Sequence, residues 1–388
     1  MRIIFRNLIL CYATFFYYYR KNHKIMTFEP KIAIDARMIA RSGIGTCIQH
    51  WIKYLNYKVI LGDLKELENY KEYNLIQIPF VSPIYGYKEQ LKFPYRLLKQ
   101  QKPDILHIPH CNIPIFYRGL MLVTIHDLTH LVYPEFLPIK LAHLYFKFMF
   151  WFVSKRADHI LVVSENTKRD MEHFFKVPTS KMTVVPLGVG EEFYVKSKSS
   201  FSYLYEKYDI PEKCKILLYV GNQLPHKNLE RLLEGFSLMK GKENCRLVLV
   251  GKTFDGRSKK TNEKKLGIGN LVIQVGRVSQ EELVDFYNLA DLFVLPSLYE
   301  GFGLPILEAF ACGTPVACSN TSSLPEVGGN VAKYFDPKDA LSISKTLESA
   351  INDKGKYDEK IKAWVSQFTW KENAKKIQNV VKKMIENE

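Results

Sequence analysis

One nine-residue stretch carries most of the information in this sequence: Glu300-Gly301-Phe302-Gly303-Leu304-Pro305-Ile306-Leu307-Glu308. It follows an apolar run, residues 292–295, which is typical of a buried strand. Pro305 suits the first position of a helix, where its missing N–H costs nothing. Gly313 suits the C-terminal cap of that helix. The stretch therefore predicts a strand, a turn containing glycines and a short helix.

This turn has the chemistry of a phosphate site. The N-terminus of a helix presents unpaired N–H groups and the positive end of the helix dipole. Gly301 and Gly303 let the backbone approach a ligand closely. Glu300 in the turn and Glu308 inside the helix can both accept hydrogen bonds from hydroxyl groups around a bound anion. A diphosphate flanked by two sugars is the ligand class that fits, although a turn with solvated glutamates would show the same pattern.

Length and composition allow two ordinary domains. The chain has 388 residues, of which 47% are hydrophobic. Its seven cysteines are scattered and form no C-x-x-C pair, so we expect neither a disulfide framework nor a structural zinc site. A reducing cytosol fits this cysteine pattern best.

The positive charge is concentrated in the first half of the chain. Residues 1–190 carry +12 of the total net charge of +15. Nucleic acid, an anionic membrane face or a phosphate-bearing acceptor could explain this charge. No zinc-finger spacing or RNP-like aromatic motif supports nucleic acid, which we exclude as a partner. A lipid-phosphate acceptor at the inner face of the membrane remains, as does a generally basic composition.

Two apolar segments raise the question of a membrane. Residues 8–19 are apolar and flanked by basic residues, but they are short of the about 20 residues that span a bilayer. We interpret residues 1–26 either as an interfacial anchor or as an extension before a true start at Met26. Residues 138–156 could form a helix on a lipid surface. We favour the alternative that this helix is half-buried in its domain.

Short apolar runs alternate with helix-like segments along the chain. Seven such runs lie between residues 32 and 185, and five lie between residues 216 and 317. Runs of this length between helices indicate parallel sheets covered on both faces. We expect two Rossmann-like domains, at residues 27–190 and 215–367, joined by a linker at 191–214. Ligands of such sheets bind at the carboxyl ends of the strands.

Three further segments place polar residues at those strand ends. Residues 221–228 follow a predicted strand and contain Lys227, a point charge for a diphosphate. Residues 35–37 end the first strand, and the glycine-rich residues 42–46 open the next helix, so that backbone N–H groups can reach an anion. His126 follows the strand at residues 121–125 and so lies in the expected ligand crevice.

These segments together resemble the retaining GT-B glycosyltransferases of family 4. Residues 300–308 resemble the E-x7-E motif of that family, and residues 221–228 resemble its G-x-x-x-x-K-N segment. His126-Asp127-Leu128 matches the H-D-L segment, and residues 35–46 are similar to the mannosyltransferase-like branch. The resemblance covers nearly the whole chain after Met26. It implies two Rossmann-like domains facing each other across a cleft, with a C-terminal helix at 368–388 that crosses back to the first domain.

The resemblance also implies a role for each site residue. Glu300 would contact the hydroxyls of the donor sugar, Glu308 the ribose, Lys227 the diphosphate and His126 the reacting sugar. The remaining candidates for the donor side are Gly45, Val278, Gly301, Phe302, Gly303 and Leu304. Candidates for the acceptor side are Arg37 and His110, although Arg37 could instead form a structural salt bridge.

The sequence departs from the family at two positions. Asn222 and His226 stand where many members have arginine. Charge neutralisation would therefore depend on Lys227 and backbone N–H groups, unless His226 is protonated. No Asp-x-Asp tripeptide occurs, so we expect metal-independent transfer and no cofactor, with the nucleotide sugar as a substrate.

The resemblance implies a retaining hexosyltransferase in the biosynthesis of a cell-surface glycan such as lipopolysaccharide or O-antigen. The expected donor is GDP-mannose, and the expected acceptor is a polysaccharide or a lipid-linked glycan. Such an enzyme would be cytoplasmic or peripheral on the inner membrane face. Two alternatives stay open: a nucleotide-sugar 2-epimerase, and a nucleotide- or glycan-binding protein without turnover.

Overall fold

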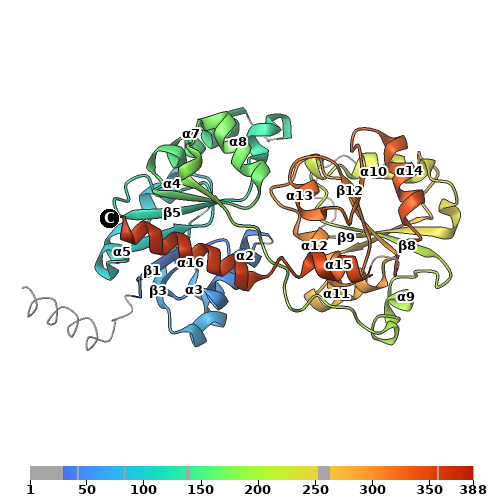
Figure 1. Ribbon diagram of the computed structural model, residues 1–388, viewed down its shortest axis with the longest axis horizontal. Coiled ribbons are helices and arrows are strands. Elements are labelled where there is room, and N and C mark those ends of the chain that lie inside the picture. Colours follow the sequence, from blue (N-terminus) through green and yellow to red (C-terminus); the bar gives the residue numbers. More distant parts are fainter. Residues whose placement is uncertain are drawn as a thin grey trace, which may run out of the picture.

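The structure is a computed structural model that describes residues 29–41, 43–82, 84–136, 140–251, 263–355 and 358–387. Residues 1–26, for which we proposed an anchor or an extension, lie outside the described residues, as does Ser42. The chain forms two α/β halves that lie side by side, each built on one parallel sheet (Figure 1). The expected fold class is therefore confirmed.

The first sheet has seven parallel strands in the order β3-β2-β1-β4-β5-β6-β7. The strands β1 and β4 are buried along their whole length, because helices cover both faces of the sheet. The strands are β1 (Ile32–Asp35), β2 (Tyr57–Gly62), β3 (Ile76–Pro79), β4 (Ile105–Ile108), β5 (Leu120–Ile125), β6 (His159–Val162) and β7 (Met182–Val184). The helices are α2 (Ile44–Tyr54), α3 (Leu64–Leu67), α4 (Tyr87–Lys92), α5 (Tyr95–Gln101), α6 (Thr129–Val132), α7 (Lys140–Arg156) and α8 (Glu165–Phe175).

The second sheet has six parallel strands in the order β10-β9-β8-β11-β12-β13. The strands are β8 (Lys215–Val220), β9 (Cys245–Val250), β10 (Val272–Gly276), β11 (Leu292–Leu295), β12 (Val316–Ser319) and β13 (Lys333–Phe335). The helices are α9 (Tyr203–Lys207), α10 (Leu229–Leu238), α11 (Gln280–Leu289), α12 (Leu304–Ala311), α13 (Leu324–Gly328), α14 (Ala340–Ala350), α15 (Asp358–Val365) and α16 (Trp370–Glu386). The apolar runs predicted all the strands except β13, an edge strand with one buried residue among its three.

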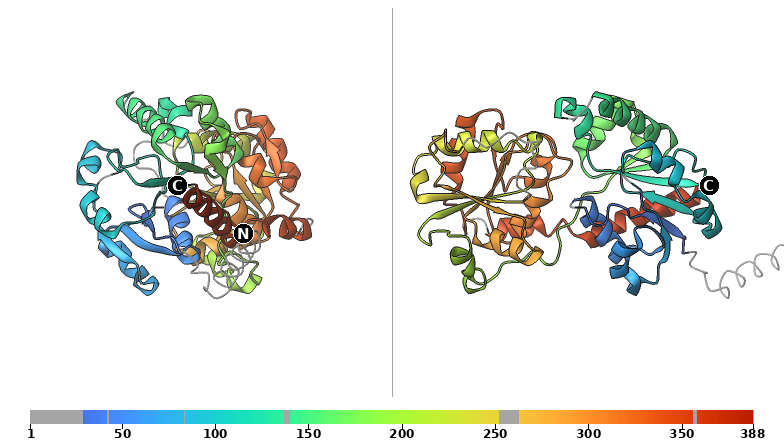
Figure 2. Two further views of the ribbon diagram at one scale, coloured as in Figure 1. Left: turned by 60° about the vertical axis from the view of Figure 1, so that its left-hand side comes forward. Right: turned by 180° about the vertical axis from the view of Figure 1, so that it is seen from behind.

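The last helix, α16, returns to the first half and packs on it, as Figures 1 and 2 show. Asn373 of α16 accepts a hydrogen bond of 2.8 Å from the indole nitrogen of Trp51 in α2. The ring of Trp370 stacks on His50 at a centroid distance of 4.5 Å, so this tryptophan is a packing anchor. One hydrophobic cluster contains buried residues of both halves, which ties them together. Among the helices in the described ranges, none is both long and apolar enough to cross a bilayer.

The chain crosses itself tightly where α16 begins. Val189 forms a parallel bridge with Thr369, and its N–H donates to the carbonyl of Phe368 at 3.0 Å. A Cβ placed on Gly188 would lie 2.2 Å from the backbone nitrogen of Trp370. Only glycine fits this crossing without a backbone shift.

We therefore expect Gly188→Ala to destabilise the protein by about 1 to 3 kcal/mol, because the added methyl overlaps backbone that cannot rotate away. The midpoint of thermal unfolding measures the effect. Gly269→Ala is the matched control, since a Cβ there makes only an ordinary contact of 3.7 Å. Equal midpoints for the two variants would contradict the tight crossing.

Candidate active site

The stretch that opened the sequence analysis folds as a strand, a turn and a helix. The strand β11 ends at Leu295, Glu300 lies in the turn, and α12 begins at Leu304 with Glu308 inside it. Gly303 caps α12 at a φ of 109°, a conformation that favours glycine. The chain leaves the helix through Gly313 at a φ of 72°, as expected for a C-terminal glycine.

Lys227 and Glu300 form an ion pair at the centre of the candidate site. The ammonium of Lys227 lies 2.7 Å from Oε1 of Glu300, and the hydroxyl of Ser297 donates to the same oxygen at 2.6 Å. Both partners are largely shielded from solvent, with side chains 21% and 15% exposed. They meet because β8 and β11 are neighbouring parallel strands, whose carboxyl ends lie at one edge of the sheet. The two separate sequence segments therefore build one site.

Hydrogen bonds to residues that follow neighbouring strands hold the loop that carries Lys227 in place. The backbone carbonyl of His226 accepts a hydrogen bond of 2.8 Å from the N–H of Leu298. The amide of Asn228 donates to the carbonyls of Pro296 and Pro337 at 2.9 and 2.8 Å. Burial, together with the nearby charge of Lys227, lowers the pKa of His226 to about 4. His226 is therefore neutral at pH 7, and Lys227 is the cation that this loop contributes.

Glu308 occupies a separate position, inside α12. The buried hydroxyl of Tyr287 on α11 donates to Oε2 of Glu308 at 2.7 Å. Burial raises the pKa of Glu308 to about 7, although the hydrogen bond from Tyr287 opposes the shift. The carboxylate of Glu192, in the segment that joins the two halves, adds to the increase. Glu308 can thus exchange a proton near neutral pH when a ligand changes its surroundings.

His126 lies opposite this edge, on the first half. A Cβ on Gly301 would lie 1.9 Å from the carbonyl oxygen of His126, so the two backbones are in direct contact. The hydroxyl of Thr167 bridges the same place, 3.3 Å from the carbonyl of His126 and 3.4 Å from that of Gly301. The structure therefore brings His126 to the turn that begins at Glu300.

The imidazole of His126 is neutral and has an unused nitrogen. Burial lowers the pKa of His126 to about 4. Its Nε2 is buried and has no hydrogen-bond partner among the described residues. Because a buried polar atom without a partner costs free energy, this nitrogen is suited to a ligand hydroxyl.

Other contacts between the two halves come from residues that the sequence analysis did not assign to the site. The carboxylate of Glu326 accepts hydrogen bonds from the N–H groups of Glu165 and Asn166 at 2.7 and 2.8 Å, at the N-terminus of α8. The hydroxyl of Tyr299 donates to Asp170 at 2.5 Å. No sequence pattern marks these pairs, since their members are 129 to 161 positions apart.

Arg37 and His110 belong to a buried ionic cluster. The guanidinium of Arg37 binds Asp35 at 2.6 Å and Glu89 at 2.6 Å, and Nε2 of His110 lies 3.4 Å from Asp35. Burial alone would raise the pKa of Asp35, but Arg37 and His110 outweigh burial and hold it well below its ordinary range. The salt-bridge interpretation of Arg37 thus accounts for its position, and an acceptor contact stays a prediction.

A small cavity of about 70 Å³ adjoins this cluster. The cavity is bounded by α2, α6 and α7, and by the ends of β4 and β5. Its polar lining comes from Tyr85, His110, His126, Asp127 and His130. It links the proposed acceptor residue His110 to the proposed sugar contact His126.

Two further donor candidates, Gly45 and Val278, lie at positions that local structure explains. The N–H of Gly45 donates to the carbonyl of Arg41 at 2.6 Å, and a Cβ on Gly45 would lie 2.4 Å from the carbonyl oxygen of Ile39. Close packing therefore requires this glycine, whose contact with a diphosphate stays a prediction. Val278 follows β10 and precedes the capping box of Ser279 and Glu282 on α11. This places Val278 at a strand end, where ligands of parallel sheets bind, and its contact with the donor stays a prediction.

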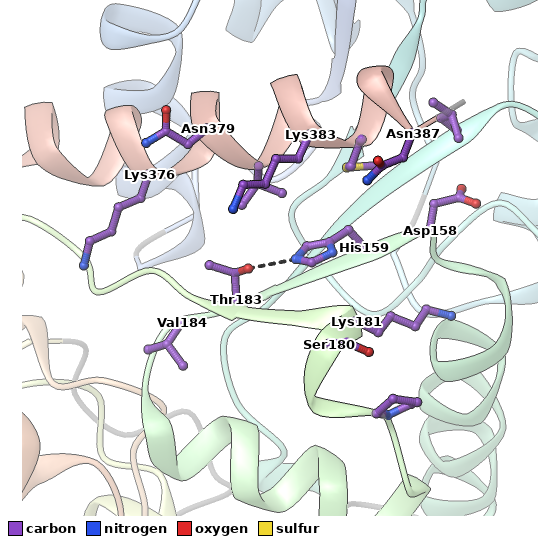
Figure 3. A pocket seen from close by; sticks show the side chains of 14 residues that line it. Asp158, His159, Ser180, Lys181, Thr183, Val184, Lys376, Asn379, Lys383 and Asn387 are labelled. Atoms are coloured by element: carbon purple, nitrogen blue, oxygen red, sulfur yellow. Dashed lines mark hydrogen bonds between the residues drawn. The ribbon is translucent and has the colours of Figure 1, made fainter.

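A larger pocket lies elsewhere and contains none of the predicted site residues. It measures about 1050 Å³ and lies between α16 and the strands β6 and β7. Figure 3 shows Lys376 and Lys383 of α16 above His159, which shares a hydrogen bond of 2.8 Å with Thr183. Pocket size alone would thus point away from the strand ends. In the described part of the chain, no group of three His, Cys, Asp or Glu residues is arranged to hold a metal ion.

Comparison with known proteins agrees with this geometry. Residues 204–382 match the family model described as glycosyl transferases group 1, and residues 60–193 match the one described as glycosyltransferase family 4. The chain is 30% identical over 259 residues to O-antigen chain mannosyltransferase B of Escherichia coli, which covers 66% of this chain and 67% of that protein. It is 32% identical over 231 residues to the serotype-specific mannosyltransferase WbdA of Escherichia coli. That match covers 57% of this chain but only 28% of WbdA.

A solved structure shows the same fold at lower sequence identity. The crystal structure of Anabaena HepE in complex with UDP and glucose superposes with a TM-score of 0.75 at 16% identity, over 92% of this chain and 100% of that one. The motifs, the two parallel sheets and the matches along the chain lead to one conclusion. This chain belongs to the glycosyltransferases of family 4, the glycosyl transferases group 1, and has their two-domain GT-B fold.

Proposed function

We propose that this protein is a retaining mannosyltransferase that transfers mannose from GDP-mannose to a polysaccharide or lipid-linked glycan. The product would belong to a cell-surface glycan of the O-antigen type. Two relatives are named as mannosyltransferases, which supports mannose as the transferred sugar. The observation that carries the proposal is the ion pair of Lys227 and Glu300, together with the Nε2 of His126, which has no hydrogen-bond partner among the described residues.

The ion pair suggests how donor binding prepares the site. A diphosphate carries more negative charge than one carboxylate and competes with Glu300 for the ammonium of Lys227. Once Lys227 turns to the diphosphate, Oε1 of Glu300 keeps only the hydroxyl of Ser297. Glu300 can then accept hydrogen bonds from the hydroxyl groups of the donor sugar. Donor binding would thus release the carboxylate that orients the sugar, in the same step that neutralises the leaving group.

His126 and the helix dipoles would stabilise the other charges that develop during the transfer. A neutral imidazole can accept a hydrogen bond from a sugar hydroxyl at Nε2, and in this proposal it would lie near the positive charge that develops on the reacting sugar. The N-terminus of α12, capped by Gly303, directs its positive end toward the turn of Glu300. In this proposal the leaving diphosphate takes the proton of the acceptor, and the protein supplies position and electrostatic stabilisation rather than a nucleophile.

The donor can be tested by ligand-dependent stabilisation followed by product analysis. We expect GDP-mannose to raise the thermal midpoint more than UDP-glucose does, because a ligand at 100 times its Kd stabilises by about 2.7 kcal/mol. With acceptor present, GDP should be released at the same rate with and without EDTA. A changed sugar formed from the donor alone would favour the epimerase, and binding without GDP release under any condition would favour the non-catalytic protein.

Replacement of either member of the ion pair should impair turnover. We expect Lys227→Ala and Glu300→Ala each to lower kcat by about 10²- to 10³-fold, the scale of one lost electrostatic contact in a transition state. Steady-state rates with saturating donor provide the measurement. Lys215→Ala is the matched control, because Lys215 pairs with Asp291 at 3.0 Å and begins β8 at the opposite sheet edge. Parent-like rates for both active-site variants would refute the assigned roles.

The raised pKa of Glu308 predicts a pH-dependent affinity for nucleotide. Without donor, Glu308 holds its proton up to about pH 7, so its contribution to the free energy of unfolding falls as pH rises from about 4.5 through 7. Ribose hydroxyls that donate to the carboxylate favour its ionised form, so donor binding should release a proton. We expect GDP affinity to rise by up to tenfold per pH unit below 7 and to level off above it.

Calorimetry of GDP binding in buffers of different ionisation enthalpy measures the proton release directly. The variant Glu308→Gln should remove both the release and the pH dependence. Proton uptake on binding would mean that Glu308 donates to the ribose rather than accepts from it.

A further inference from the structure

The helix α7 (Lys140–Arg156) has two apolar faces, and only one of them is used inside the protein. The inner face packs into the first half through Phe146, Met149, Phe150 and Val153, all of which are at most 5% exposed. The outer face carries four large apolar side chains that are strongly exposed: Leu141 at 69%, Leu144 at 61%, Phe148 at 46% and Trp151 at 48%. The expectation of a half-buried helix is therefore correct, but it leaves the outer face unexplained.

The outer residues form one continuous stripe. Their spacing of three, four and three positions places them on a single side of the helix. Single exposed apolar residues are common on protein surfaces and need no explanation. A stripe of four on one helix, two of them aromatic, is a patch of the kind that marks an interaction surface.

Basic residues lie beside this stripe and at its C-terminal end. Residues 140–156 contain no acidic residue, and the exposed Lys147 and Lys155 lie beside the apolar side chains. At the end of α7, Lys181 donates to the carbonyls of Ser154 and Lys155 at 2.9 and 3.4 Å. Figure 3 shows Lys181 at the edge of the neighbouring pocket. The C-terminal end of the stripe is thus bordered by basic side chains.

The charge pattern discriminates between possible occupants of the stripe. A symmetric contact with a second copy would set these lysines against the same lysines of the partner, and like charges repel. An anionic bilayer would instead attract them, while phenylalanine and tryptophan side chains enter the interface between headgroups and acyl chains. The excess charge of the first half, +12 over residues 1–190, favours the same partner.

We propose that the outer face of α7 is a membrane-docking surface for a bilayer rich in anionic lipid. The inner face of the same helix lines the cavity of about 70 Å³ through Phe146 and Phe150, and Phe146 stacks on His130 at 4.0 Å. Docking would therefore hold the acceptor side of the site one helix diameter from the lipid surface. This placement suits the lipid-linked acceptor of the proposed function, but the docking surface itself does not depend on which sugar is transferred.

Trp151 provides a local reporter in the full-length protein. The chain has four tryptophans, and the others, Trp51, Trp364 and Trp370, are buried or partly buried. We expect vesicles of phosphatidylethanolamine and phosphatidylglycerol to shift tryptophan emission to the blue, and brominated lipid to quench it. Both effects should disappear in Trp151→Phe and should be weak with neutral phosphatidylcholine vesicles.

A binding assay with matched variants tests the surface independently of catalysis. We expect Leu144→Glu combined with Phe148→Glu to lower the affinity for anionic vesicles at least tenfold in co-sedimentation. Leu238→Glu combined with Leu341→Glu is the control, since these residues of the second half are 54% and 51% exposed. Nucleotide-induced thermal stabilisation should be equal in both double variants, which shows that the fold and the donor site are intact.

Three results would overturn the proposal. Vesicle binding that persists in the α7 variant would place the membrane contact elsewhere on the chain. An unchanged Trp151 signal in vesicle-bound protein would exclude this face. A concentration-dependent dimer that loses its association in the α7 variant, without vesicle binding, would make a second copy the occupant. A failed mannosyl transfer would refute the proposed function and leave these outcomes unaffected.

Discussion

The ion pair between Lys227 and Glu300 is the interaction around which the candidate site is organised. It joins two loops that leave neighbouring parallel strands, and it neutralises two charges that are both largely removed from solvent. The backbone around it is held by Asn228 and by the contact between His226 and Leu298, so the pair is positioned before any ligand arrives. The ion pair forms without a ligand, and a more highly charged anion can displace the carboxylate of Glu300 from Lys227. Donor binding and sugar orientation can therefore be linked through one ammonium group, although the chain lacks the second cation that arginine at Asn222 would supply.

On the side of the first half, the candidate site is formed by a close contact between two backbone segments rather than by an ion pair. Gly301 touches the carbonyl of His126, and Thr167 bridges both carbonyls. Glu326 adds an anionic cap at the N-terminus of α8, where the helix dipole favours negative charge. These contacts join the two halves beside the candidate site, and α16 joins them as well through Trp370 and Asn373. The candidate site thus lies between two halves that several contacts hold together.

Charge and apolar surface are distributed unequally between the halves, and each half has a distinct task in the proposed function. The second half concentrates its polar contacts at strand ends for a soluble nucleotide sugar. The first half carries most of the net charge, a buried ionic cluster around Asp35, and an apolar helix face that the fold leaves uncovered. An acceptor carried by lipid and a donor carried by nucleotide would need such different surfaces. In this proposal one face of α7 lines the acceptor side and the other face forms the outer surface.

The sequence by itself determined the fold class, because apolar runs of strand length between amphipathic helices can be buried only in covered parallel sheets. It also predicted site positions for Glu300, Lys227 and His126, since each follows a strand and ligands bind at the carboxyl ends of parallel strands, and for Glu308 inside the helix after Glu300. It missed β13, in which only one of three residues is buried, and it could not choose between the roles of Arg37. Only the tertiary structure decided which strand ends are neighbours, that Glu89 and His110 enclose Arg37 and Asp35, and that the apolar residues of α7 divide into a buried and an exposed face. The reason is physical: strand and helix patterns arise from neighbours along the chain, whereas ion pairs, pKa shifts and uncovered surface depend on segments that folding brings together from far apart.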